Sequence, residues 1–301
     1  MRMSTRPILI LALACVGALT GLTATTVAEQ AGGARERTLF VSAVDKDGEP
    51  VTGLGPDAFV VREDGVRREV LRVSRATEPI DIALLVDNST AASDEITFLR
   101  DGLSKFVAKM AVGNNVAVIT LADRPTILVD YTSDPKRLSD AVGRLFSMPQ
   151  SGMTLLDAIV ETSQGLGRRE TPRAVIVPVI TDGTEFTNRY STDVVSSLER
   201  VDAALHIVGI GQFFYSEEHG IRERSFLLSN GPAKSGGQQI TLLSPHGLDQ
   251  ALQRLARELS SQYKVIYGRP QSLIPPERTE VTSAKTGVTM RGAPARGESG
   301  A

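Results

Sequence analysis

The sequence contains no tryptophan and few aromatic residues of any kind. Aromatic side chains make up 5% of the 301 residues. With so few aromatic side chains, a surface that stacks nucleic-acid bases or sugar rings is not expected. Basic side chains are not in excess either, because the formal net charge is -2. Without a basic surface, neither nucleic acid nor an anionic membrane is expected as a partner.

Cysteine occurs only once, at Cys15, inside an N-terminal apolar run. Two arginines precede this run over residues 8–22, and the small residues Thr26-Val27-Ala28 follow it. This order is typical of a cleaved signal peptide, here residues 1–28, and predicts a secreted or periplasmic protein. The run is short for a membrane span, so none is expected after cleavage. An uncleaved anchor and lipidation of the cysteine are the alternatives. The mature chain then has no cysteine, which excludes disulfides and thiol catalysis.

A small β unit is predicted directly after the signal peptide. Residues 29–36 are small and polar and are interpreted as a linker, and the β unit spans residues 37–78. Its first strand is indicated by alternation over residues 39–44, and a turn follows at Asp45-Lys46-Asp47-Gly48.

From residue 79 to 268 the pattern changes to apolar runs that alternate with amphipathic segments. This alternation predicts an α/β fold: a doubly wound, mostly parallel sheet with helices on both faces. The polar stretch at 211–237 is interpreted as a surface loop, with a short helix within it as the alternative. The expected strands of this sheet lie at residues 80–86, 116–121, 126–129, 174–180, 204–210 and 263–267.

The C-terminal part of the chain predicts a second small β element. Residues 269–291 contain two short apolar stretches after Pro275-Pro276 and are interpreted as a hairpin that packs on the β unit. Residues 292–301 are expected to form a disordered tail.

Three polar loops follow or precede the buried segments of the predicted sheet. They are Asp87-Asn88-Ser89-Thr90-Ala91, Ser151-Gly152-Met153-Thr154 and Thr181-Asp182-Gly183-Thr184. Ligands of open α/β sheets bind beyond the carboxyl ends of the strands. We therefore expect these loops to carry the function.

The loops resemble those of the von Willebrand factor A domain family. That family has a metal-ion-dependent adhesion site built from an Asp-x-Ser-x-Ser motif, a threonine in a second loop and an aspartate in a third. By position, Asp87 and Ser89 match the first motif, Thr154 matches the threonine and Asp182 matches the aspartate. Segments 45–54 and 255–263 extend the resemblance to a bacterial secreted subgroup, the VWFA-related proteins.

The resemblance implies a binding protein rather than an enzyme. In the family, the site holds Mg²⁺ or Mn²⁺, and an acidic side chain of a protein partner completes the coordination. Such hard cations prefer oxygen ligands. Here Ala91 stands where the motif has its second serine, and a methyl group cannot bind a metal. The metal is therefore expected to bind more weakly than in the family, or not at all.

Two alternative functions remain open from the sequence. One is a metal-free scaffold of the same fold that binds its partner through the loops, which Ala91 favours. The other is a phosphoryl-transfer hydrolase with Asp87 as the nucleophile. That chemistry usually needs a second carboxylate two residues later, where Ser89 stands, and a lysine in a following loop, which is missing near Thr154 and Asp182. The sequence indicates neither a particular partner nor an oligomeric state.

Overall fold

The computed structural model describes residues 35–270 and 276–297. The predicted signal peptide lies outside these residues. Within them, the chain forms two six-stranded sheets, one mostly parallel and one antiparallel, together with six α-helices. No helix of the described residues has the length and apolar character needed to cross a membrane.

The mostly parallel sheet is the framework of the candidate site. Its strand order is β6-β5-β4-β7-β8-β9, and only β6 runs antiparallel to its neighbour. Almost every residue of the central strands is buried, as expected for apolar runs covered on both faces. The strands are β4 (Ile80–Val86), β5 (Asn115–Thr120), β6 (Thr126–Thr132), β7 (Arg173–Thr181), β8 (Ala203–Ile210) and β9 (Gln238–Leu242).

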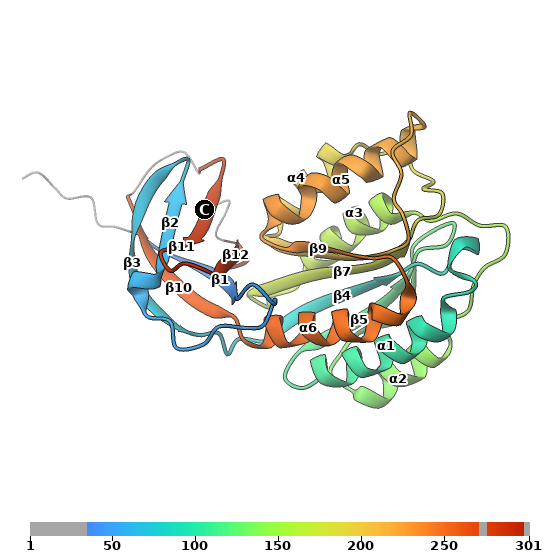
Figure 1. The fold of residues 1–301 in the computed structure, drawn as a ribbon, viewed down its shortest axis with the longest axis horizontal. Helices are drawn as coiled ribbons and strands as arrows, with labels where there is room; N and C mark the ends of the chain where they lie inside the picture. The colour runs from blue at the N-terminus through green and yellow to red at the C-terminus, as the bar shows by residue number, and fades with distance from the viewer. Residues whose placement is uncertain (1–34, 271–275, 298–301) are drawn as a thin grey trace, which may run out of the picture. The chain divides into compact units, whose positions relative to one another are not determined.

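Helices cover both faces of this sheet (Figure 1). One face packs against α1 (Ile96–Met110), α2 (Pro135–Gly143) and α6 (Leu248–Ser260). The other packs against α3 (Leu155–Leu166), α4 (Ser191–Arg200) and α5 (His219–Ser235). Successive side chains of β4 alternate between the two resulting cores, as strand geometry requires. The predicted doubly wound α/β fold is confirmed.

The antiparallel sheet has the strand order β11-β2-β3-β10-β1-β12. Strands from both ends of the described chain build it, which confirms that the C-terminal segment joins the N-terminal β unit. The strands are β1 (Arg35–Val44), β2 (Phe59–Glu63), β3 (Val66–Arg75), β10 (Tyr263–Arg269), β11 (Thr279–Ser283) and β12 (Thr289–Pro294).

The sequence interpretation of the C-terminal strands was wrong in two respects. The segment 263–267, expected as the last strand of the parallel sheet, belongs to β10 and pairs with β1 and β3 instead. Its burial alternates residue by residue, which is typical of a strand with one covered face. The predicted hairpin does not form either, because β11 pairs with β2 and β12 pairs with β1.

Two further predictions are corrected. Residues 219–235 of the predicted loop form the helix α5, whose buried positions include glycine, glutamate and arginine and therefore give no apolar stripe. Residues 292–297 of the expected disordered tail are ordered, and residues 298–301 lie outside the described residues. β12 extends to Pro294, and the Arg296 guanidinium donates to the backbone carbonyls of Leu166, Arg169 and Thr171. Polar anchoring of this kind leaves no hydrophobic signal in a sequence.

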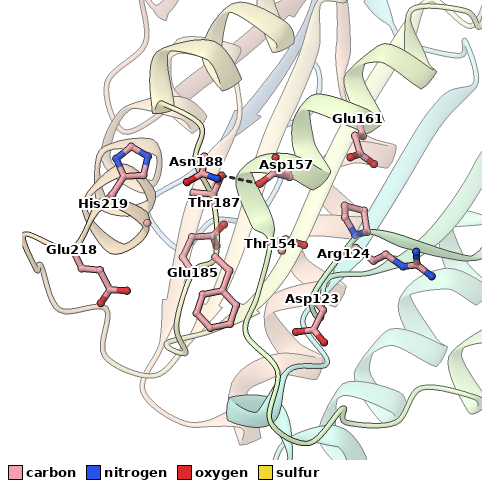
Figure 2. A pocket seen from close by; sticks show the side chains of 13 residues that line it. Asp123, Arg124, Thr154, Asp157, Glu161, Glu185, Thr187, Asn188, Glu218 and His219 are labelled. Atoms are coloured by element: carbon pink, nitrogen blue, oxygen red, sulfur yellow. Dashed lines mark hydrogen bonds between the residues drawn. The ribbon is translucent and has the colours of Figure 1, made fainter.

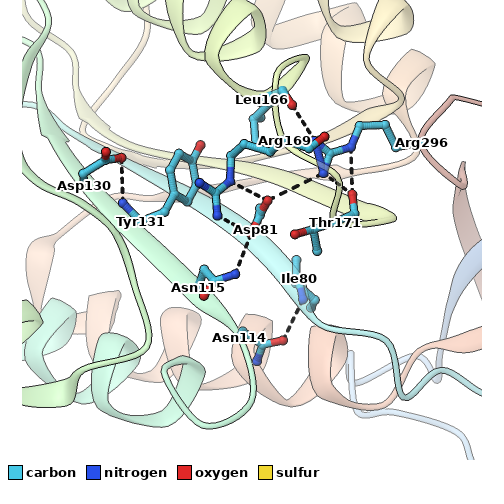
Figure 3. A network of polar contacts seen from close by, with 10 residues as sticks. All are labelled: Ile80, Asp81, Asn114, Asn115, Asp130, Tyr131, Leu166, Arg169, Thr171 and Arg296. Atoms are coloured by element: carbon cyan, nitrogen blue, oxygen red, sulfur yellow. Dashed lines mark hydrogen bonds and ion pairs between the residues drawn. The ribbon is translucent and has the colours of Figure 1, made fainter.

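A buried ionic network stands at the amino end of the parallel sheet (Figure 3). Asp81, near the start of β4, is fully buried, and Arg169 binds both of its carboxylate oxygens at 2.6 and 3.2 Å. Asn115 donates to the same carboxylate at 2.9 Å, and Arg296 lies 3.6 Å from it. Each oxygen of this carboxylate therefore has at least two partners.

Candidate functional site

The three loops named by the sequence are hydrogen-bonded to one another at the carboxyl end of the parallel sheet. Thr90 N–H donates to the Ser151 carbonyl at 3.4 Å, and Ser151 N–H donates to Thr90 Oγ1 at 3.0 Å. Met153 N–H donates to the Thr184 carbonyl at 2.9 Å, and its carbonyl accepts from Phe186 N–H at 2.7 Å. Loops far apart in the chain therefore form one continuous surface.

Asp87 lies at the base of this surface, directly after β4, and is fully buried. One carboxylate oxygen accepts from Ser89 N–H at 2.9 Å. The other accepts from the backbone N–H of Thr181 at 3.1 Å and from its hydroxyl. The carboxylate thus ties the loop after β4 to the end of β7. Thr181 was not singled out from the sequence as a site residue, although it stands beside Asp182.

Ser89 presents a buried hydroxyl that has no hydrogen-bond partner. The residue is 1% exposed, and its Oγ is among the unpartnered buried atoms of the described chain. A buried hydroxyl without a partner costs free energy, so a native structure that keeps one calls for an explanation. A ligand that binds this oxygen would provide one.

The position of the missing motif serine faces the third loop. A Cβ atom placed on Gly183 would lie 2.6 Å from the Ala91 Cβ and 3.6 Å from Ser89 Oγ. Ala91 therefore stands beside the unpartnered hydroxyl. Thr90 is turned away from it, since its own hydroxyl donates to the Met148 carbonyl at 3.3 Å. Ser93 does not replace the missing ligand, because its exposed hydroxyl donates to the Thr90 carbonyl at 2.7 Å.

Thr154 and Asp182, the other two predicted ligands, approach the same surface with their side chains already engaged. Thr154 precedes α3, and its Oγ1 donates to the Leu121 carbonyl at 2.8 Å, which leaves lone pairs free to accept. The Asp182 side chain is exposed, and Oδ2 accepts from Gln212 N–H at 2.9 Å. The carboxylate fills the space beside Gly211, whose φ of +109° suits glycine.

The main residue that sequence reasoning missed is Arg224 on α5. It is 2% exposed, and its guanidinium donates to the Gly183 carbonyl. Burial lowers the pKa of Arg224, while the nearby carboxylates of Glu185, Asp182 and Asp87 act to raise it. Because α5 was interpreted as a loop, no signal connected this arginine with the site.

Glu185 is a second buried ionisable residue close to the loops. Its carboxylate accepts from Leu155 N–H at 3.2 Å and from Leu156 N–H at 3.3 Å and so caps the start of α3. Burial raises the pKa of Glu185 to about 8, against the opposing effect of the two backbone hydrogen bonds. The residue positions Thr154 by fixing the first turn of the helix that follows it.

An open pocket of about 610 Å³ adjoins Thr154 (Figure 2). Acidic side chains from α3 and from neighbouring loops line it, among them Asp123, Glu161 and Glu218. Asp157, also in the lining, accepts from Thr187 Oγ1 at 2.8 Å and pairs with Arg189 at 2.6 Å.

Exposed aromatic rings surround this end of the sheet. Three of them make ring contacts: Tyr190 packs edge-on against His219 at 5.3 Å, and Tyr215 packs against Phe226 at 6.5 Å. In a chain so poor in aromatic residues, these rings concentrate exposed apolar surface on the loops after β7 and β8 and on α5. The set comprises Phe186, Tyr190, Phe214, Tyr215 and Phe226, each 47–71% exposed.

The donor set fits a hard cation in part. The unpartnered Ser89 hydroxyl, the Thr154 hydroxyl and two carboxylates are oxygen ligands of the kind that Mg²⁺ prefers. Ala91 contributes no ligand, and the Arg224 charge lies behind the loops. Among the described residues, no group of three or more His, Cys, Asp or Glu side chains could hold a metal ion. A metal here would depend on the hydroxyls.

The serine, threonine and aspartate loops lie at the carboxyl ends of the parallel strands, where open α/β sheets bind their ligands. Residues 82–185 match the family model of the von Willebrand factor type A domain. Over these residues the chain is therefore similar to von Willebrand factor type A domains. No curated protein sequence gives a significant match.

Solved structures of A-domain proteins are similar to this chain. Proximal thread matrix protein 1 from the mussel byssus aligns with a TM-score of 0.50 and 16% identity, over 69% of this chain and 50% of its own. A second structure of that protein, with zinc in its metal-ion-dependent adhesion site, gives a TM-score of 0.49 at 16% identity and the same coverage. The von Willebrand factor domain of the pilus tip protein Mfa5 from Porphyromonas gingivalis gives 0.46 at 12% identity, over 60% of this chain and 95% of its own.

Proposed function

We propose that this chain is a secreted or periplasmic, adhesion-type binding protein, and that its partner docks on the loops at the carboxyl end of the parallel sheet. In this proposal Asp87, Ser89, Thr154 and Asp182 hold Mg²⁺ or Mn²⁺ weakly. An acidic side chain of the partner completes the coordination. The protein performs no catalysis.

The observation that carries the proposal is the unpartnered hydroxyl of Ser89. This oxygen is buried beside a carboxylate, in the loop that the family uses for metal binding. The hydrogen bonds among the three loops support it, because they bring the segments of Thr154 and Asp182 to the same surface. The exposed aromatic rings nearby supply apolar area for a protein partner.

The buried state of Asp87 argues against the phosphoryl-transfer alternative. Both of its oxygens already accept hydrogen bonds, and its exposure is zero. A nucleophile must reach its substrate. We therefore expect no hydrolysis of an aryl phosphate by the wild-type protein; turnover that disappears in Asp87→Asn would favour the enzyme instead.

A capture experiment tests the binding proposal. The immobilised mature chain is incubated with a native cell-envelope extract, in Mg²⁺ and then with chelator. Wild type should retain a partner only in Mg²⁺, and Asp182→Ala should retain none. Asp130→Asn, which changes an exposed acid on β6, is the matched control and should behave as wild type.

The same experiment distinguishes the metal-free scaffold, which Ala91 and the Arg224 charge favour. In that case the partner stays bound in chelator but is lost when the exposed aromatic residues are replaced, for example in Phe186→Ser/Tyr190→Ser. Capture that neither the chelator nor these substitutions change would place the interface elsewhere on the chain and contradict both forms of the proposal.

A further inference from the structure

Arg224 brings a buried positive charge to the rear of the candidate metal site. Its side chain crosses from α5 to the third loop, where the guanidinium donates to the Gly183 carbonyl. The guanidinium carbon lies 5.3 Å from the centre of the Phe213 ring, and Nε has no hydrogen-bond partner. A buried guanidinium is costly unless neighbouring negative charges compensate it. The negative charges near Arg224 are therefore the groups that could stabilise it.

The contact with Gly183 places this charge close to the metal ligands. Gly183 directly follows Asp182, and its Cα faces both the Ala91 methyl and the Ser89 hydroxyl. The carbonyl of Gly183 thus contacts Arg224, and its Cα lies beside the incomplete ligand set. The nearby acids comprise the two predicted carboxylate ligands and Glu185.

We propose that Arg224 is the resident cation of this site: it supplies from within the chain part of the positive charge that a divalent metal would supply, and thereby keeps metal affinity low. The inference rests on the proposed function, because it takes Asp87, Ser89, Thr154 and Asp182 as the ligand set. The carboxylates of Asp87 and Asp182 lie within electrostatic range of the Arg224 guanidinium, so a metal ion bound by them would be repelled by its positive charge.

Two features then weaken metal binding independently of each other. Ala91 removes an oxygen ligand, whereas Arg224 supplies a competing charge. Arg224 also holds the third loop in place without a metal, through its hydrogen bond to the Gly183 carbonyl.

Removal of the charge tests the inference directly. In Arg224→Gln, the amide can still donate to the Gly183 carbonyl, but the positive charge is gone. Isothermal titration calorimetry should show Mg²⁺ and Mn²⁺ binding at least about tenfold tighter than in wild type, equivalent to about 1.4 kcal/mol. In chelator, the melting temperature of the variant should lie below that of wild type, and Mg²⁺ should restore it.

Two variants serve as controls. Arg224→Lys keeps the charge and should bind metal like wild type. Arg173→Gln removes another buried arginine, at the opposite end of β7, which donates to the Glu78 and Leu259 carbonyls. It should lower the melting temperature equally with and without Mg²⁺.

The outcomes separate the two proposals. If Ala91→Ser binds metal more tightly than wild type but Arg224→Gln does not, Arg224 is not a competing cation, and the proposed metal site stands. If even Ala91→Ser/Arg224→Gln binds no metal, the proposed ligand set itself is wrong. Failure of Arg224→Gln to fold in millimolar Mg²⁺ would also contradict the inference, because the metal should replace the lost charge.

Discussion

The two ends of strand β4 carry two buried aspartates in opposite situations. Asp81 at the amino end is bound by two arginines and an asparagine, so its charge is neutralised and its oxygens are used. Asp87 at the carboxyl end has only N–H and O–H donors, and beside it stands the unpartnered hydroxyl of Ser89. Both residues are equally buried. The two ends of β4 therefore differ in hydrogen bonding and not in burial. The carboxyl end, the candidate functional end, keeps an oxygen without a partner, whereas the oxygens of Asp81 at the amino end, the structural end, all have partners.

The largest effect is expected at the structural end. Asp81→Ala leaves the guanidinium groups of Arg169 and Arg296 without their carboxylate, and should lower the free energy of unfolding by about 3–5 kcal/mol. Urea denaturation should give the same loss with and without Mg²⁺. Asp140→Ala, which breaks the exposed ion pair with Lys136, should leave stability unchanged within error. If Mg²⁺ reduced the loss of unfolding free energy in Asp81→Ala, the amino and carboxyl ends of β4 would not be independent.

A pH-dependent effect is expected behind the functional end, at Glu185. Its pKa is raised to about 8, so between pH 4.5 and 8 the folded chain holds a proton that the unfolded chain has released. Stability from this group is therefore fully present below about pH 4.5 and is lost as the pH rises through 8, by at most about 1.4 kcal/mol per pH unit.

Glu185→Gln tests this dependence, because the amide oxygen can still accept from an N–H group at the start of α3, and the amide does not titrate. Denaturation midpoints measured from pH 5 to 8 should fall in wild type and change less in the variant. Equal slopes in the two proteins would show that Glu185 is already ionised over this range.

The smallest effect concerns the metal affinity. Ala91→Ser restores a hydroxyl beside Ser89, and calorimetry should show Mg²⁺ binding about tenfold tighter, or about 1.4 kcal/mol. Ser93→Ala, the matched control two residues further on, removes a hydroxyl that only caps a turn and should leave the affinity unchanged. An effect of Ser93→Ala as large as that of Ala91→Ser would mean that the loop rearranges around the metal.

Most of the fold could be predicted from the sequence because the parallel strands are long apolar runs. The run at residues 80–86, for example, matches β4 at both ends. What could not be predicted depends on polar contacts. Helix α5 buries Glu223 and Arg224 where an apolar stripe would be expected, and Arg296 anchors the C-terminal segment through backbone carbonyls. Neither feature gives a hydrophobic pattern.

For the candidate site, motif spacing singled out three loops that the structure joins by hydrogen bonds, but it did not indicate the buried Arg224 and Glu185 beside them. Asp87 and Ser89 could be named because they are close in sequence, and Thr154 and Asp182 because they match a family pattern. Arg224 reaches the third loop from a helix that begins more than thirty residues after Asp182. Contact of this kind depends on tertiary packing, which a single sequence does not reveal.

Anomalous diffraction from crystals grown in Mn²⁺ tests the central claim most directly. For Ala91→Ser, with wild type in parallel, we predict a peak within about 2.2 Å of Ser89 Oγ, close enough for direct coordination. The wild-type peak should be weaker. A peak only in the acidic pocket near Asp123 and Glu161, or none at the carboxyl end of β4 in either protein, would contradict the assignment.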